Sequence, residues 1–134
     1  MTGLSPYLSL PGTAREALTF YADVFGGTVR MHTLAQMGRA DGPADAIGHG
    51  ELINGAVTIF ASDAGGDDSP LKTEGLMFAL LGTSTSADLR RWFDGLAVGG
   101  RIADPLIRRP WGAWDGQVVD QFGVHWLIGF ETED

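Results

Sequence analysis

The sequence predicts an α+β fold in which two βαβββ modules build a single domain. Two observations lead to this prediction. Apolar runs and amphipathic stretches follow one another in the order strand, helix, three strands, and the same order then repeats. Both predicted helices also end at a pair of glycines, Gly26-Gly27 and Gly99-Gly100, and the same spacing relates Phe20 to Phe93. These matches indicate an internal duplication.

The first module begins with a short apolar run, Leu4–Leu10, which is typical of a strand and is closed by Pro11-Gly12. The next four residues, Thr13-Ala14-Arg15-Glu16, have the spacing of a capping box, in which the threonine oxygen and the glutamate satisfy free N–H groups at the start of a helix. The apolar residues that follow recur at helical spacing and predict an amphipathic helix: Ala17, Leu18, Phe20, Tyr21, Val24 and Phe25.

Three strands are expected after this helix. Thr28–Met37 alternates between two faces, as a strand with one wetter side does. Ile47–Ile53 and Ala56–Ser62 are joined through Asn54-Gly55, a dipeptide that accepts the left-handed backbone angles of a tight hairpin.

The second module repeats this order. Gly75–Leu81 is a continuously apolar strand, and Thr83–Ser86 offers several N-caps for an amphipathic helix. Arg101–Ile107 is a strand interrupted by Pro105. The module closes on a hairpin, in which two β-prone segments flank a glycine turn: Gln117–Asp120, Gln121-Phe122-Gly123 and Val124–Ile128.

One module alone would leave an apolar sheet face bare, and a sheet must bury such a face against something. We therefore expect module 1, about residues 4–63, and module 2, about residues 75–131, to lie side by side in one domain of residues 1–134. Together they would form one curved mixed sheet with the helices on the outside. The inside of that curve is the expected pocket.

Composition restricts the class of protein. The chain has 134 residues and a formal net charge of −8, which argues against nucleic acid or an anionic membrane as the main partner. It contains no cysteine, no apolar run long enough to span a bilayer and no signal-peptide pattern at its start, so we expect a cytoplasmic protein. One acidic cluster, Asp63, Asp67 and Asp68, lacks the oxygen spacing of a calcium loop and favours a solvated turn.

Several segments together resemble a known family. They are Pro6-Tyr7-Leu8, Glu16–Tyr21 with Val24–Gly27, Ile47–Leu52, Trp111–Gly116 and Asp120–Trp126. With the paired βαβββ modules, they are similar to the vicinal oxygen chelate superfamily of glyoxalases, bleomycin-resistance proteins and dioxygenases, and within it to the PhnB-like branch. Members of that branch are often named ubiquinone methyltransferases, but this chain has no glycine-rich strand-to-helix turn for a methyl donor.

The resemblance implies a divalent metal held by His, Glu or Gln on the first and last strands of each module, with open positions for a substrate with neighbouring oxygens. Here those strands are poor in ligands. Leu4–Leu10 offers only serines and Tyr7, and Gly75–Leu81 offers none. In the last strand, the position that fits a glutamate of metal-dependent relatives is Leu127, with His125 two residues earlier. We therefore expect no metal at the usual site and no other cofactor.

Two residues are candidates for catalysis. His49 and Glu51 lie two positions apart on one predicted strand and so face the same way. They suit an acid/base pair or a partial metal site at the edge of the pocket, and alternatively a hydrogen-bonding pair on a solvent-facing strand. His125 is expected to be structural, and His32 to be exposed.

The candidates for ligand binding are mainly aromatic. Trp111, Trp114 and Trp126 could stack on a planar ligand, and alternatively close the core or a dimer seam. Tyr7, the aromatic residue of the first strand, is included with them. Arg109, one of two adjacent arginines before a proline, could clamp an anionic group or lie in a solvated loop.

The resulting prediction is a cytoplasmic small-molecule binding protein without the usual metal, which forms a homodimer as members of the family commonly do. Two alternatives stay open. One is a metal-dependent lyase, isomerase or dioxygenase with an unusual site at His49 and Glu51. The other is a structural dimer module that binds no ligand.

Overall fold

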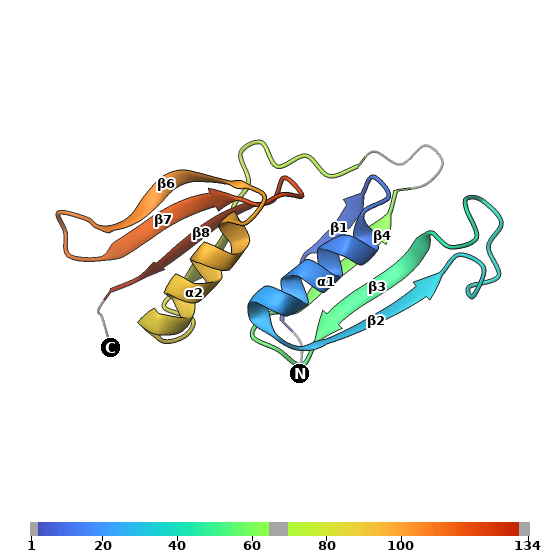
Figure 1. The fold of residues 1–134 in the computed structure, drawn as a ribbon, viewed down its shortest axis with the longest axis horizontal. Coiled ribbons are helices and arrows are strands. Elements are labelled where there is room, and N and C mark those ends of the chain that lie inside the picture. Colours follow the sequence, from blue (N-terminus) through green and yellow to red (C-terminus); the bar gives the residue numbers. More distant parts are fainter. Residues whose placement is uncertain (1–2, 65–69, 132–134) are drawn as a thin grey trace. The chain divides into compact units, whose positions relative to one another are not determined.

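Figure 1 shows a computed structural model of the chain, which describes residues 3–64 and 70–131. The chain divides into two compact units, Met1–Leu71 and Lys72–Asp134, and this division falls between the two predicted modules. The elements of module 1 are β1 (Tyr7–Leu10), α1 (Ala14–Phe25), β2 (Thr28–Thr33), β3 (Ile47–Ile53) and β4 (Ile59–Asp63). Those of module 2 are β5 (Phe78–Leu81), α2 (Ser86–Ala97), β6 (Arg101–Arg108), β7 (Trp114–Val119) and β8 (His125–Phe130).

Each module contains a four-stranded mixed sheet, and the two sheets have the same topology. The strand orders are β1-β4-β3-β2 and β5-β8-β7-β6. In both, the first strand runs parallel to the last strand of its own module, and the other neighbours are antiparallel. The predicted α+β fold of two βαβββ modules is therefore confirmed.

One face of each sheet is covered by the helix of its own module (Figure 1). In module 1, Leu8 and Leu52 point to the covered face and are buried, together with Leu18 of α1. A Cβ atom added to Gly50 would lie 2.5 Å from Leu18 Cδ1, so any larger residue there would displace this buried side chain of α1. Since side chains alternate along a strand, the neighbours of Gly50 in β3 point to the uncovered face.

Module 2 repeats this contact between helix and sheet. A Cβ atom on Gly116 of β7 would lie 2.8 Å from Phe93 Cε2 of α2 and 2.7 Å from the backbone of Leu106 in β6. The segment of β6 that comes close to Gly116 is irregular: the strand register shifts on either side of Asp104, and Pro105 follows. Because β6 is an edge strand, proline and bulges there oppose pairing with another chain.

The two helices begin in different ways. Thr85 caps α2 as expected, since its Oγ1 accepts a 3.1 Å hydrogen bond from Asp88 N. The capping box predicted for α1 is wrong, because the Thr13 side chain makes no capping hydrogen bond. Neither helix has the length or apolar character needed to cross a bilayer.

Asp63 replaces the missing cap of α1. Its Oδ1 accepts a 2.9 Å hydrogen bond from Ala14 N, and its Oδ2 accepts a 2.8 Å hydrogen bond from Ile47 N. This carboxylate, on the last residue of β4, thus holds the first residues of α1 and β3 together. The prediction that Asp63 belongs to a solvated turn is wrong; the other two members of that acidic cluster, Asp67 and Asp68, lie outside the described residues.

We predict that Asp63→Ala lowers the free energy of unfolding by about 1–2 kcal/mol, because two backbone donors lose a charged acceptor. Urea unfolding followed by circular dichroism measures this change. Thr13→Ala is the matched control and should cost less than about 0.5 kcal/mol, since no capping bond is lost. Equal losses for the two variants would contradict the role assigned to Asp63.

Candidate functional site

Three rings meet on the uncovered face of the module 1 sheet. Tyr7 of β1 and Phe60 of β4 are Cα partners in the parallel ladder, and Phe60 is paired with Glu51 of β3. His49 lies two residues before Glu51, so the two predicted catalytic residues share this face. We call Tyr7, His49 and Phe60 the aromatic patch.

The rings of the aromatic patch contact one another. A hydrogen bond of 3.0 Å joins Tyr7 Oη and His49 Nδ1. The ring centroids are 5.7 Å apart for Tyr7 and His49, 6.1 Å for Tyr7 and Phe60, and 5.9 Å for His49 and Phe60. Tyr7 is 52% exposed, and His49 and Phe60 are partly exposed.

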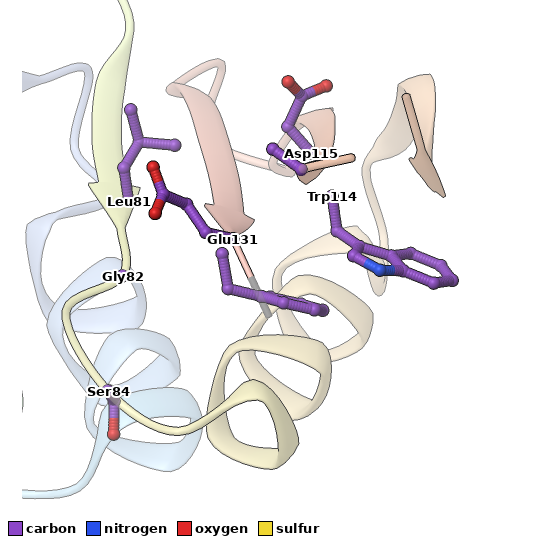
Figure 2. A pocket seen from close by; sticks show the side chains of 8 residues that line it. Leu81, Gly82, Ser84, Trp114, Asp115 and Glu131 are labelled. Carbon is purple, nitrogen blue, oxygen red and sulfur yellow. The ribbon is translucent and has the colours of Figure 1, made fainter. Parts of the chain in front are cut away.

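A second candidate site lies within module 2. It is a pocket of about 470 Å³ where β5, β7 and β8 approach the loop that leads into α2 (Figure 2). We call it the tryptophan pocket. It is lined by Leu81, Gly82, Ser84, Ala113, Trp114, Asp115, Phe130 and Glu131.

The aromatic wall of the tryptophan pocket is built from two paired strands. Trp114, the first residue of β7, is the Cα partner of Phe130, the last residue of β8. Their rings lie 5.9 Å apart with an interplanar angle of 18°. The guanidinium carbon of Arg90 in α2 lies 4.6 Å from the Trp114 ring centroid and 5.1 Å from that of Phe130. These cation–π contacts fix both rings against the helix.

Arg109 organises the β6–β7 hairpin beside this pocket. Its Nε donates to Asp115 Oδ1 at 2.8 Å, and one terminal nitrogen donates to Asp104 Oδ2 at 2.8 Å and to the backbone oxygen of Asp115 at 3.1 Å. The hydrogen bond to Asp115, with the charge of Asp104, raises the pKa of the Arg109 guanidinium above its ordinary value. The structure thus places the predicted anion clamp in an internal ion-pair network.

The profile of the Glyoxalase/Bleomycin resistance protein/Dioxygenase superfamily matches residues 4–128. The chain belongs to this superfamily. It is 30% identical over 138 residues to protein YjdN of Escherichia coli (strain K12), with 93% of this chain and 92% of YjdN covered.

Solved structures agree with this membership. Protein PA1353 from Pseudomonas aeruginosa shares 31% identity and a TM-score of 0.78, with 100% of both chains covered. A PhnB protein from Bacillus cereus, described as a candidate 3-demethylubiquinone-9 3-methyltransferase, gives a TM-score of 0.73 at 19% identity, with 96% of this chain and 99% of that chain covered. At that identity the likeness shows the fold alone. The superfamily predicted from the sequence is confirmed. The structural neighbours of this chain include a PhnB protein.

The residues at the superfamily's usual metal positions do not fit a divalent ion. On the uncovered face of module 1, the first and last strands present Tyr7 opposite Phe60. In module 2 the corresponding strands present Ala79 opposite Leu127. Within residues 3–64 and 70–131, no three or more His, Cys, Asp or Glu side chains are grouped closely enough to hold a metal ion. The donor set that such an ion requires is therefore not assembled there.

The other two predicted tryptophans lie in different surroundings. Trp126 is 2% exposed in the core of module 2, and its Nε1 donates a 2.9 Å hydrogen bond to Asp120 Oδ2. Trp111 is 72% exposed in the loop between β6 and β7. Of the three tryptophans proposed as ligand-binding residues, only Trp114 lines the tryptophan pocket.

Asp120 is a structural residue that the sequence analysis did not single out. It is 3% exposed, and its Oδ1 accepts hydrogen bonds from Phe122 N at 2.8 Å and Val124 N at 3.1 Å. An aspartate directly before a turn that contains glycine is a recognisable signal for such bonds. His125, whose Nε2 lies 2.9 Å from Gln117 Oε1 on the neighbouring strand, agrees with the structural role expected of it.

Phe60, Phe130 and Arg90 were also missed as candidate site residues. Phe60 lay inside an apolar stretch predicted as a strand, where phenylalanine suggests core packing. Phe130 lay beyond the predicted end of its strand at Ile128. The position of Arg90 depends on how α2 packs against the sheet, which the sequence pattern does not give.

We predict that Trp126→Phe lowers the free energy of unfolding by about 1–3 kcal/mol, because the buried Asp120 carboxylate loses an N–H donor and the smaller ring leaves space in the core. Trp111→Phe should cost less than about 0.5 kcal/mol, since that ring is mostly in solvent. Urea unfolding followed by circular dichroism compares the two tryptophans directly. A larger loss for Trp111→Phe would contradict these assignments.

Proposed function

We propose that this superfamily member is a small-molecule binding protein that holds its ligand in the tryptophan pocket without the help of a metal ion. The observation that carries the proposal is the pocket of about 470 Å³ walled by Trp114 and Phe130. This volume falls within the roughly 300–1,000 Å³ typical of sites for small organic molecules. Aromatic walls with a few polar groups are also typical of such sites.

The lining favours a ligand with a flat apolar part. Trp114 and Phe130 offer two nearly parallel rings that a planar group can contact, and Arg90 holds these rings in place. Glu131 adds a carboxylate (Figure 2), whereas the Ser84 hydroxyl donates a 2.6 Å hydrogen bond to Asp88 Oδ2. Together with the net charge of −8, the carboxylate favours a neutral or cationic ligand over an anionic one.

A second candidate function is catalysis at the aromatic patch. The observation that favours it is the hydrogen bond between Tyr7 and His49, because a phenol and an imidazole joined in this way can pass a proton. Glu51 lies on the same face of β3 as a further acid/base group. Turnover of a bound compound that His49→Gln abolishes, with binding affinity kept, would establish this enzyme function.

We further propose that the protein acts in the cytoplasm as a homodimer, with no membrane or nucleic-acid partner. The net charge of −8 supports the absence of polyanionic partners. Exposed Trp111 offers an apolar contact for a second copy, and sedimentation of the intact chain tests the dimer.

We predict that Trp114→Leu weakens ligand binding about tenfold, because the ligand loses an aromatic contact worth about 1–1.5 kcal/mol. Planar metabolites and antibiotics would first be screened by quenching of tryptophan fluorescence. Dissociation constants for the compounds that bind would then be measured by calorimetry. Trp111→Leu, three residues away and outside the pocket, is the matched control and should change the affinity less than about twofold.

Two results would contradict the proposal. One is the absence of binding by any compound in the panel, which favours a structural module. The other is equal weakening by the Trp111 and Trp114 variants while both stay folded.

A further inference from the structure

The hydrogen bonds around the tryptophan pocket determine which polar groups it offers to a ligand. The Ser84 hydroxyl donates its proton to Asp88 Oδ2 at 2.6 Å, so the Ser84 oxygen can only accept within the pocket. Asp115 and Glu131 line the pocket with carboxylates, which are also acceptors. Trp114 adds an indole N–H, but this uncharged donor does not offset two carboxylates. The side-chain oxygens of the pocket therefore require a ligand that donates hydrogen bonds.

The charges beside the pocket leave it negative. Arg109 forms ion pairs with both Asp104 and Asp115, so this network of one cation and two anions keeps a net charge of −1. The hydrogen bonds from Arg109 use Oδ1 and the backbone oxygen of Asp115, so Asp115 Oδ2 can still accept. Glu131 adds a further negative charge. Arg90 contacts the aromatic rings from α2 and is not among the residues that line the pocket.

The aromatic wall and the carboxylates point to opposite sides of the sheet. Trp114 and Phe130 are Cα partners, and both rings contact Arg90 of α2, so they lie on the helix side. Asp115 directly follows Trp114, and Glu131 directly follows Phe130, so the alternation of side chains turns both carboxylates to the other side. Figure 2 shows both carboxylates on the same side of the Trp114 ring. A ligand that contacts rings and carboxylates must therefore bend around the strand ends.

The two carboxylates are close enough to share one cation. Asp115 is the Cα partner of Gly129, and Glu131 lies two residues further along the chain. Residues in this diagonal relation lie about 7–8 Å apart across paired strands. An ammonium group has three N–H donors, so a single one placed between these side chains can donate to both.

We propose that the tryptophan pocket selects arylalkyl amines, in which a flat aromatic ring is joined by a short flexible arm to a protonated amine. The ring lies against Trp114 and Phe130, the arm bends around the strand ends, and the ammonium group donates to Glu131 and Asp115. This inference rests on the proposed function and deepens it, because it names the class of ligand and makes Glu131 a residue that determines specificity.

The test uses three naphthalene compounds that share the ring and a two-carbon arm. They are 2-(2-naphthyl)ethylamine, 2-(2-naphthyl)ethanol and 3-(2-naphthyl)propanoate, which are cationic, neutral and anionic at neutral pH. Calorimetry with the intact chain measures their dissociation constants. We expect the amine to bind about tenfold more tightly than the alcohol, and the propanoate to bind most weakly. Added salt should weaken binding of the amine but not of the alcohol, because salt screens the attraction between charges.

The variants separate the contribution of charge from that of the rings. Glu131→Gln should weaken amine binding about fivefold and change alcohol binding less than about twofold. Glu16→Gln in α1, which removes the same charge from module 1, is the matched control and should change neither. Trp114→Leu should weaken the amine and the alcohol alike, which locates both in the tryptophan pocket. The comparison of amine with alcohol in the unmodified chain needs no variant to fold.

Any of three results would overturn the ligand class and leave the proposed function standing. The first is equal binding of the amine and the alcohol, with both weakened by Trp114→Leu. The second is an amine affinity that neither Glu131→Gln nor added salt changes. The third is binding of other planar compounds while none of the three naphthalene compounds binds. If no planar compound of any charge binds, the proposed function fails together with this inference.

Discussion

The contact between each helix and the strands beneath it is the constraint on which the rest of the structure depends. At Gly50 in β3 and Gly116 in β7, an added Cβ atom would lie only 2.5 Å from Leu18 Cδ1 and 2.8 Å from Phe93 Cε2, so the sheet backbone packs directly against helix side chains. One face of each sheet is thereby fixed as core. Because side chains alternate along a strand, the residues free to act must lie on the other face or at the strand ends. Both candidate sites obey this rule.

The duplication has produced two modules with one topology and different chemistry. In module 1 the parallel strands β1 and β4 bring Tyr7 and Phe60 together on the uncovered face, and His49 joins them from β3. In module 2 the corresponding face presents Ala79 and Leu127, and the aromatic pair Trp114 and Phe130 stands at the strand ends beside α2. Both modules thus present aromatic side chains. In module 1 the pairing of β1 with β4 positions them, and in module 2 the pairing of β7 with β8 does.

The sequence predicted the elements well where the evidence was local. The bounds of β3, Ile47–Ile53, and the end of α1 at Gly26 follow from residues within a few positions of each other. The start of α1 after Thr13 was also predicted correctly, but the group that accepts its first hydrogen bond was not, because Asp63 lies 49 residues from Ala14 and only the folded sheet brings the two together. Among the tryptophans, composition could not separate Trp114 from Trp126. That difference depends on depth: Trp126, the second residue of β8, is buried, whereas Trp114, the first residue of β7, is partly exposed.

The central claim is that this chain binds its small-molecule ligand through aromatic rings and not through a metal ion. Elemental analysis of the purified protein, before and after incubation with zinc, nickel, manganese and ferrous iron, tests that claim most directly. The account predicts no stoichiometric ion and no change of melting temperature on adding a chelator. One ion per chain that disappears in His49→Ala would contradict it.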